Sequence, residues 1–163
     1  TLSKMSENNW IITGAIVRPS VDDISTRVDI VNNITTPAGS TLTVPFDNVV
    51  YDDLSAFNIA NPTRLTVPAG VSRVDVFAYA QYAGGGIPVG TEMFMRIDHY
   101  NSLGARLAVV AAADSTSAWQ DLRWSCGQIG IPVSVNDYFD LKLNESNVSS
   151  ILTRCRLTLR EAN

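Results

Sequence analysis

VPFDNVVYDDLSAFNIANPTRLTVPAGVSRVDV, residues 44–76, decides the fold of this chain. Aromatic residues punctuate its first half, at Phe46, Tyr51 and Phe57. In its second half the turn formers Pro68 and Gly70 precede a segment in which polar and apolar residues alternate. Such alternation places every second side chain on the same face of a strand. The stretch therefore predicts short strands that are separated by turns.

The same period-two alternation recurs along the rest of the chain. We expect strands over residues 10–17, 27–31, 41–46, 64–67, 72–82, 92–100, 106–111, 120–126, 138–144 and 151–160. Clusters of Gly, Pro, Asn and Ser stand between most of them. The Ala-rich run 109–113 is compatible with a helix by propensity, but it is too short to change the class. Many short strands without interleaved helices predict an all-β sandwich or barrel.

Two sets of residues resemble the C1q/TNF-like jelly roll. In that family a Phe on the first long strand is followed by Val-x-x-Asn/Asp, an aromatic residue with Asn or Asp, and a Thr-Val-Pro-x-x-Gly segment. The matching residues here are Phe46, Val50, Asp53, Phe57, Asn58, Leu65, Thr66, Val67, Pro68, Gly70 and Val71. Residues 135–143, VNDYFDLKL, are similar to the start of a late strand in the family.

The resemblance covers residues 40–161 and implies an antiparallel jelly-roll β-sandwich that assembles as a homotrimer. Family members serve as binding or structural heads and are not enzymes. Ser72 and Asn136 stand where the family has Tyr and Gly. The calcium-binding and receptor-contact loops of individual family members have no counterpart in this sequence, so no ligand site is transferred.

Composition sets independent bounds on function. At 163 residues the chain has the length of one domain, and its charged fraction of 17% is low beside 45% hydrophobic residues. Apolar surface that polar groups do not cover favours an oligomer. A net charge of -4 with scattered basic residues argues against nucleic-acid binding. No run approaches the roughly eighteen apolar residues of a membrane helix, and the first residues lack the layout of a signal peptide.

Chemistry-bearing residues are sparse. His99 is the only histidine, and no nucleophile motif accompanies it, so we expect no enzyme, no catalytic residue, no metal and no cofactor. Acidic residues in turns and at strand ends most commonly have structural roles there, and we expect this of the acids in this chain. The alternative is a calcium site, built from Asp47 with Asp52 and Asp53, or from Asp137 and Asp140.

Cys126 and Cys155 are the only cysteines, and both stand in apolar alternation. Free cysteine is among the most buried residue types and behaves as a small hydrophobe. We therefore expect two buried free thiols. One disulfide between neighbouring strands is the alternative.

The first 36 residues are the least family-like part of the chain. They are polar, and the segment TTPAGS at residues 35–40 reads as a boundary. We therefore divide the chain into an N-terminal extension, 1–36, and a jelly-roll head, 37–163. Trp10, Ile12 and Val17 are candidates for a segment that mounts the head by adding strands to a neighbour. The alternative is an ordinary edge strand of the same domain.

The resemblance also suggests an interface. Aromatic and aliphatic side chains line the trimer axis in the family, so we place Tyr79, Tyr138 and Phe139 near it.

Phage versions of this head are similar in having a short chain, few lysines and no disulfide framework. The expected function is a structural bacteriophage virion protein on the particle surface, as a capsid decoration or fibre head. Its partners would be the major capsid or tail proteins. The alternative is a C1q-like recognition module that binds a receptor or a host-surface glycan, at a tail-fibre tip or as a secreted protein.

Overall fold

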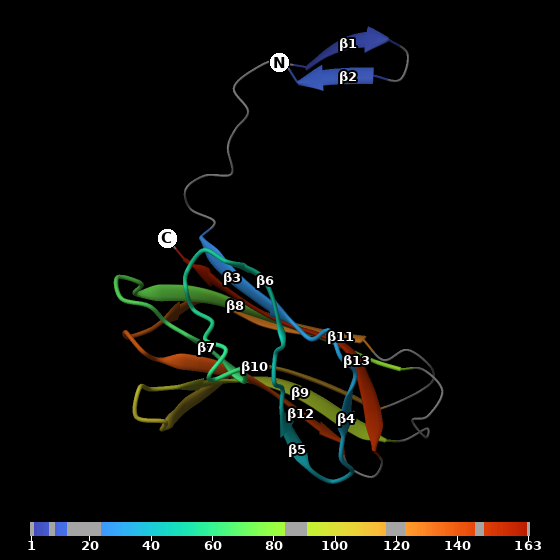
Figure 1. Cartoon of the computed structure of the whole chain (residues 1–163), viewed down its shortest axis with the longest axis vertical. Helices are drawn as coiled ribbons and strands as arrows, with labels where there is room; N and C mark the ends of the chain where they lie inside the picture. Colours follow the sequence, from blue (N-terminus) through green and yellow to red (C-terminus); the bar gives the residue numbers. More distant parts are fainter. Residues whose placement is uncertain are drawn as a thin grey trace.

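The structure is a computed structural model that describes residues 2–6, 9–12, 24–83, 91–116, 123–145 and 149–162. Every regular element in these ranges is a strand (Figure 1). Their bounds are β1 Leu2–Ser6, β2 Asn9–Ile12, β3 Ser25–Asp29, β4 Ile34–Thr36, β5 Thr41–Thr43, β6 Asn48–Asp52, β7 Arg64–Thr66, β8 Arg73–Tyr82, β9 Glu92–Tyr100, β10 Arg106–Thr116, β11 Arg123–Pro132, β12 Tyr138–Glu145 and β13 Ser150–Glu161. In the described part of the chain, no helix is available to cross a membrane.

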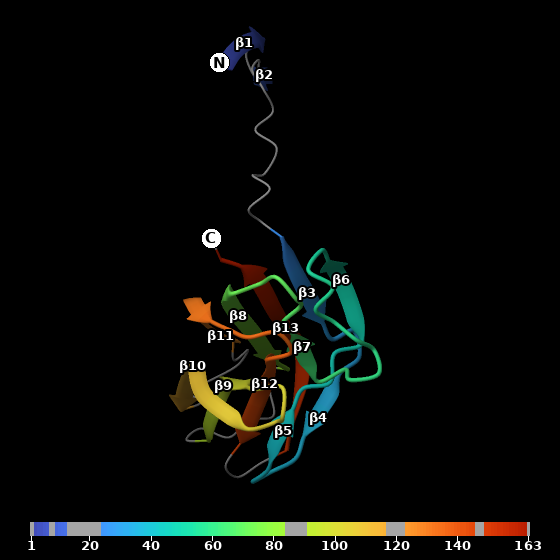
Figure 2. The same cartoon turned by 90° about the vertical axis from the view of Figure 1, so that its left-hand side faces the viewer.

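Two antiparallel sheets face each other as a sandwich (Figure 2). The five-stranded sheet has the order β10-β9-β12-β5, with β7 also paired to β12. The six-stranded sheet has the order β11-β8-β13-β3-β6, with β4 also paired to β13. Strands adjacent in a sheet are often far apart in sequence, as β13 and β3 are, which is the connectivity of a jelly roll. The predicted all-β, antiparallel jelly-roll class is confirmed.

The core lies between the two sheets and follows the alternation of the strands. In β8 the inward side chains include Val74, Val76 and Tyr82, and all three are buried. Inward residues of the five-stranded sheet meet them, among them Ile97 and Leu141. Apolar burial of this kind supplies most of the favourable free energy of folding.

The six-stranded sheet includes residues that the sequence assigned to the extension. β3 pairs with β13 on one side and with β6 on the other, and β4 pairs with β13. Inward Thr26 and Val28 of β3 are completely buried. The predicted boundary at residue 36 therefore cuts through this sheet, and the head begins no later than Ile24. Three-residue β4 and the non-alternating β6 gave too weak a pattern to be expected as strands.

The N-terminal strands form a sheet of their own. β1 and β2 pair antiparallel, with Leu2 opposite Ile12 and Lys4 opposite Trp10. A strand was expected over residues 10–17, and the structure places residues 9–12 in β2. Val17 lies outside the described residues.

Candidate functional site

The side of the six-stranded sheet that points away from the five-stranded sheet is here called the outer face. Strand alternation builds it, because residues between the buried positions of β8, β13 and β3 must point outward. Its side chains are a mixture of aromatic residues and arginines, namely Arg27, Tyr51, Phe77, Tyr79, Arg154 and Arg156.

A row of four residues with an aromatic ring at each end crosses the outer face and is here called the aromatic row. Phe77 of β8 stands opposite Thr158 of β13, which stands opposite Arg27 of β3, and Arg27 stands opposite Tyr51 of β6. Phe77 and Tyr51 keep 40% and 38% of their surface exposed. Large aromatic side chains normally bury most of their area, so this row leaves apolar surface open to a partner.

Gly127 of β11 stands opposite Phe77 at the end of the aromatic row and leaves room for the Phe77 ring. A Cβ atom built on Gly127 would overlap the Phe77 ring and come within 2.8 Å of the Val76 carbonyl oxygen. A glycine is therefore required at position 127, because the Phe77 ring and the Val76 carbonyl oxygen leave no room for a side chain. Placing an aromatic ring over a strand glycine restores packing that the glycine lacks.

A second row carries charge. Tyr79 of β8 stands opposite Arg156 of β13, and Arg156 stands opposite Asp29 of β3. The Asp29 carboxylate accepts from Arg156 Nε at 3.2 Å and from Arg27 Nη2 at 2.8 Å. The hydrogen bond from Arg27 to Asp29 raises the pKa of Arg27. The Asp29 carboxylate therefore forms ion pairs with two guanidinium groups.

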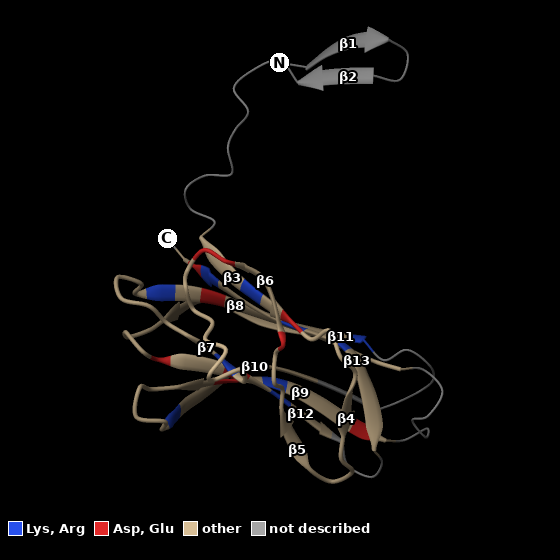
Figure 3. Ribbon diagram, in the orientation of Figure 1, with Lys and Arg blue, Asp and Glu red and all other residues tan. Residues whose placement is uncertain are grey.

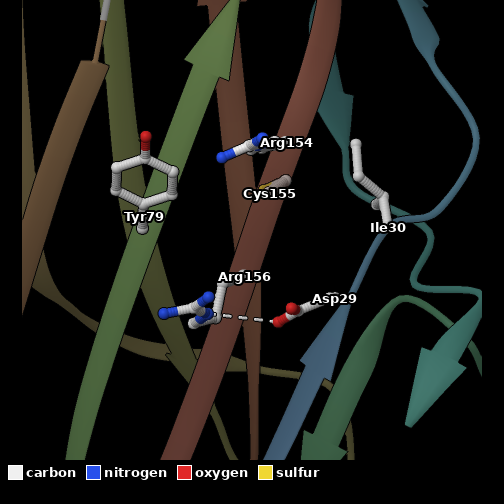
Figure 4. Close-up of a pocket in the computed structure, with 6 residues that line it drawn as sticks. All are labelled: Asp29, Ile30, Tyr79, Arg154, Cys155 and Arg156. Carbon is white, nitrogen blue, oxygen red and sulfur yellow. Dashed lines mark hydrogen bonds and ion pairs between the residues drawn. The ribbon is translucent and has the colours of Figure 1, made fainter. Parts of the chain in front are cut away.

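Among the described residues, the shared carboxylate lines one hollow of the outer face, and a second hollow opens further along β13. The larger, about 420 Å³, is lined by Asp29, Ile30, Tyr79, Arg154, Cys155 and Arg156. Figure 4 shows Arg154 and Arg156 along β13, with Tyr79 on β8 to one side and Asp29 and Ile30 to the other. The smaller hollow, about 360 Å³, is lined by Ser25, Tyr51, Phe77, Thr158 and Arg160.

At the end of the outer face nearest residue 130, an ion pair fixes a bulge. Asp75 accepts from Arg160 and, at 2.8 Å, from the backbone N–H of Gly130. Burial raises the pKa of Asp75, but these hydrogen bonds outweigh it, and the pKa lies below its ordinary value. Gly130 has a φ of 68° inside the register shift between Gln128 and Ile131, a conformation that glycine adopts without strain.

The five-stranded sheet carries a different surface. Tyr100 and Tyr138 stack with centroids 4.9 Å apart, Arg64 lies 4.5 Å over the Tyr138 ring, and Lys142 lies 4.9 Å from the Tyr100 centroid. The stack and Arg64 cover surface of the Tyr138 ring that a sugar would need, whereas Lys142 donates to the Tyr100 hydroxyl. Charged residues of both signs are interspersed along the strands of the sandwich (Figure 3).

Two buried carboxylates lie in the same cluster. Asp98 and Asp140 stand directly opposite each other on β9 and β12. Asp98 forms ion pairs with Arg96 at 3.2 Å and Lys142 at 3.3 Å. Lys142 lies 3.5 Å from Asp140 as well. Burial raises the pKa of Asp140 to about 6, with the lysine opposing part of the effect.

The three residues predicted for the trimer interface lie in three different places. Tyr79 is on the outer face, where its hydroxyl donates to Gln81 at 3.0 Å. Tyr138 is on the exterior of the five-stranded sheet. Phe139 is completely buried and stacks on His99 at 4.6 Å, so it offers no surface to a neighbouring copy. Adjacent strand residues point to opposite faces, which is why Tyr138 and Phe139 could not act together.

The acidic residues of the calcium alternative serve local structure. Asp47 accepts from the backbone N–H groups of Val31 and Asn32, and Asp52 accepts from that of Ala56. Asp137 accepts from the N–H of Ser134 and contacts the only histidine. Among the described residues, no three His, Cys, Asp or Glu side chains are grouped to hold a metal ion.

Both cysteines are free thiols. Cys155 is buried and Cys126 is half-buried. Strand β8 separates β11 from β13, so the disulfide between neighbouring strands is excluded. Burial raises the pKa of Cys126 to about 11 and that of Cys155 further.

Sequence reasoning missed the arginines of the outer face, although a signal was present. The segment RCRLTLR at residues 154–160 alternates arginine or threonine with buried apolar residues. Together with the facing strand RVD at residues 27–29, this pattern gives one face of the sheet its positive charge.

Comparison with known proteins supports the fold alone. No protein-family model matches the sequence. No curated protein matches it either. The Eiger TNF from S. frugiperda superposes with a TM-score of 0.55 over 87% of this chain and 94% of its own, at 11% identity. Murine APRIL superposes with a TM-score of 0.56 over 83% of this chain and 98% of its own, also at 11% identity. The chain therefore has a C1q/TNF-like jelly-roll fold.

Proposed function

We propose that this chain is a structural protein of a bacteriophage virion, in which homotrimeric jelly-roll heads stand on the particle surface as capsid decoration or as the head of a fibre. The observation that carries the trimer is the exposed aromatic row of the outer face. The particle role rests on the resemblance to phage heads and on an N-terminal hairpin outside the sandwich.

The composition of the outer face suits a contact between copies. Protein interfaces are enriched in Tyr, Phe and Arg and depleted in Lys. Tyr51, Phe77 and Tyr79 lie among arginines on this face. The two lysines of the chain, Lys4 and Lys142, belong to β1 and to the five-stranded sheet. The low charged fraction of 17% fits a chain that covers part of its surface by assembly.

The hairpin of β1 and β2 is the proposed mount. It includes Trp10 and Ile12, and its strands pair only with each other among the described strands. Main-chain groups at the edges of such a hairpin can add to a sheet of a neighbouring protein. The major capsid protein or a tail protein is the proposed partner.

The test is a mass-spectrometric inventory of purified virions from the phage that encodes this chain. We expect the chain in the particles, in a copy number divisible by three, and electron microscopy of labelled chains should place it on the exterior. Purified virions that lack the chain would refute the particle role.

The recognition-module alternative stays a prediction. A glycan array probed with the purified protein tests it, because saturable binding of one glycan class would favour recognition over a purely structural role.

A further inference from the structure

The larger hollow of the outer face holds donors that the chain itself does not use. Arg154 is exposed and has neither an ion pair nor a hydrogen bond within the described part of the chain. Arg156 engages Asp29 through Nε, which leaves its two terminal nitrogens free of that contact. The Asp29 carboxylate is already shared with Arg27. Positive charge therefore exceeds negative charge along this wall of the hollow.

The spacing of the two arginines suits one small anion. Residues 154 and 156 lie two apart on the same face of β13, a separation of about 7 Å along a strand. Their long side chains can converge from there on a shared acceptor. A guanidinium group presents a planar fork of donors that matches the oxygens of phosphate or sulfate. Tyr79 forms the wall beside them, and its hydroxyl donates to Gln81.

We propose that this hollow binds a free tetrahedral oxyanion, inorganic phosphate or sulfate, through Arg154 and Arg156, and that the bound ion favours assembly of the trimer. The second part rests on the proposed contact through the outer face. Copies that meet there bring their arginines together, and like charges at a contact oppose association. An anion on each pair of arginines removes this repulsion, and the rest of the 420 Å³ hollow remains for side chains of a neighbouring copy.

The experiment uses the full chain in sodium chloride, with sodium sulfate or sodium phosphate exchanged in at constant ionic strength. Isothermal titration measures binding of the ion, and sedimentation equilibrium measures the oligomer in the same buffers. We expect saturable binding to the wild type and about tenfold weaker binding to Arg154→Gln, the order expected for one lost charge-assisted contact. Arg73→Gln removes the same charge from an exposed position at the far end of β8 and should bind as the wild type does.

The outcomes separate the two proposals. If the ion binds saturably and the trimer persists to a lower protein concentration in sulfate than in chloride, both the anion site and its effect on assembly are supported. A trimer with no saturable ion binding, or with Arg154→Gln binding as tightly as the wild type, refutes the anion site and leaves the trimer standing. If the wild type is a monomer in every buffer but binds the ion, and Arg154→Gln binds it more weakly, the anion site is supported and its link to assembly is refuted.

Discussion

Asp140 is a buried carboxyl group whose negative charge the fold disfavours. It is buried beside Asp98, and like charges directly opposite on neighbouring strands repel each other. Lys142 lies between them and offsets part of the repulsion. Burial first, and the neighbouring Asp98 second, make the folded state hold the proton of Asp140 more tightly than the unfolded chain does, with a pKa of about 6 against 3.8.

Replacing Asp140 by Asn should remove a pH dependence of stability. Because the folded pKa is raised, the stability contributed by this group is complete below about pH 4 and is lost as the pH rises through 6. The difference in free energy of unfolding, Asp140→Asn minus wild type, should therefore increase as the pH rises from about 4 through 6 and stay constant at higher pH. Urea unfolding between about pH 2.5 and 7.5 measures it.

Asp47→Asn is the matched control, because its sign is opposite. Burial opposes ionisation of Asp47, but bonds from the N–H groups of Val31 and Asn32 leave its pKa below 3.8. Its contribution is present at neutral pH and is lost as the pH falls below that value. If the two variants changed with pH in the same direction, the assignment of Asp140 would be contradicted.

Phe46 tests the core. The side chain is 1% exposed and lies among the buried residues between the sheets. Phe46→Ala should lower the free energy of unfolding by about 3 to 5 kcal/mol, the usual cost of deleting a buried aromatic group. Ile59→Ala, at a loop position that is 73% exposed, should change it by less than about 0.5 kcal/mol. Equal effects in denaturant unfolding would contradict the register of this segment.

At the scale of elements, β3 decides where the head begins. It has β13 and β6 on its two sides, and the N–H of Glu161 bonds to the carbonyl oxygen of Ile24 at 3.0 Å. Removing β3 and β4 would expose buried side chains of both sheets and leave one side of β13 and of β6 without a partner.

Two truncations test this boundary. Deletion of residues 1–23 should leave a folded sandwich whose melting temperature stays within a few degrees of the wild type. Deletion of residues 1–36 should yield a chain without a cooperative thermal transition, because strands of the six-stranded sheet are lost. Circular dichroism measures both, and a cooperative transition in the shorter chain would restore the boundary at residue 36.

Gly127 tests the contact between β8 and β11. An added methyl group must displace the Phe77 ring and also press against the Val76 carbonyl oxygen, which the backbone holds in place. Gly127→Ala should therefore cost about 1 to 3 kcal/mol of stability. The double variant with Phe77→Ala relieves the ring clash alone, so part of the cost should persist. A stability equal to that of Phe77→Ala would show that the backbone clash is absent.

The sequence predicted the long inner strands well and the edges poorly. Strands β8, β9, β12 and β13 alternate clearly because one face of each is buried. β6 has no such alternation, since it lies at an edge. The segment GIP at residues 130–132 falls between the strands expected over residues 120–126 and 138–144, yet it lies in β11 at a bulge, where glycine and proline are also tolerated.

For the candidate site, the sequence singled out Tyr79 only through the family resemblance, as a residue near the expected trimer axis. The cluster of Arg27, Asp29 and Arg156 was not predicted, because it joins β3 and β13, two strands more than a hundred residues apart in the sequence. Their juxtaposition depends on which strands pair, and alternation carries no information about pairing.

At the scale of the whole molecule, the outer face is the proposed contact between copies. Phe77→Glu should keep the monomer fold, because the side chain points outward, and should dissociate the trimer by placing a charge in an apolar contact. Ile59→Glu adds the same charge at an exposed loop position and should leave the trimer intact. Sedimentation velocity at micromolar concentration distinguishes them, and a trimeric Phe77→Glu would exclude this part of the face from the contact.

Native mass spectrometry of the wild-type chain measures whether three copies assemble. We expect a principal species of three times the chain mass of 17.7 kDa at micromolar concentration. A spectrum that contains only the monomer, together with a non-trimeric arrangement on the particle, would contradict it.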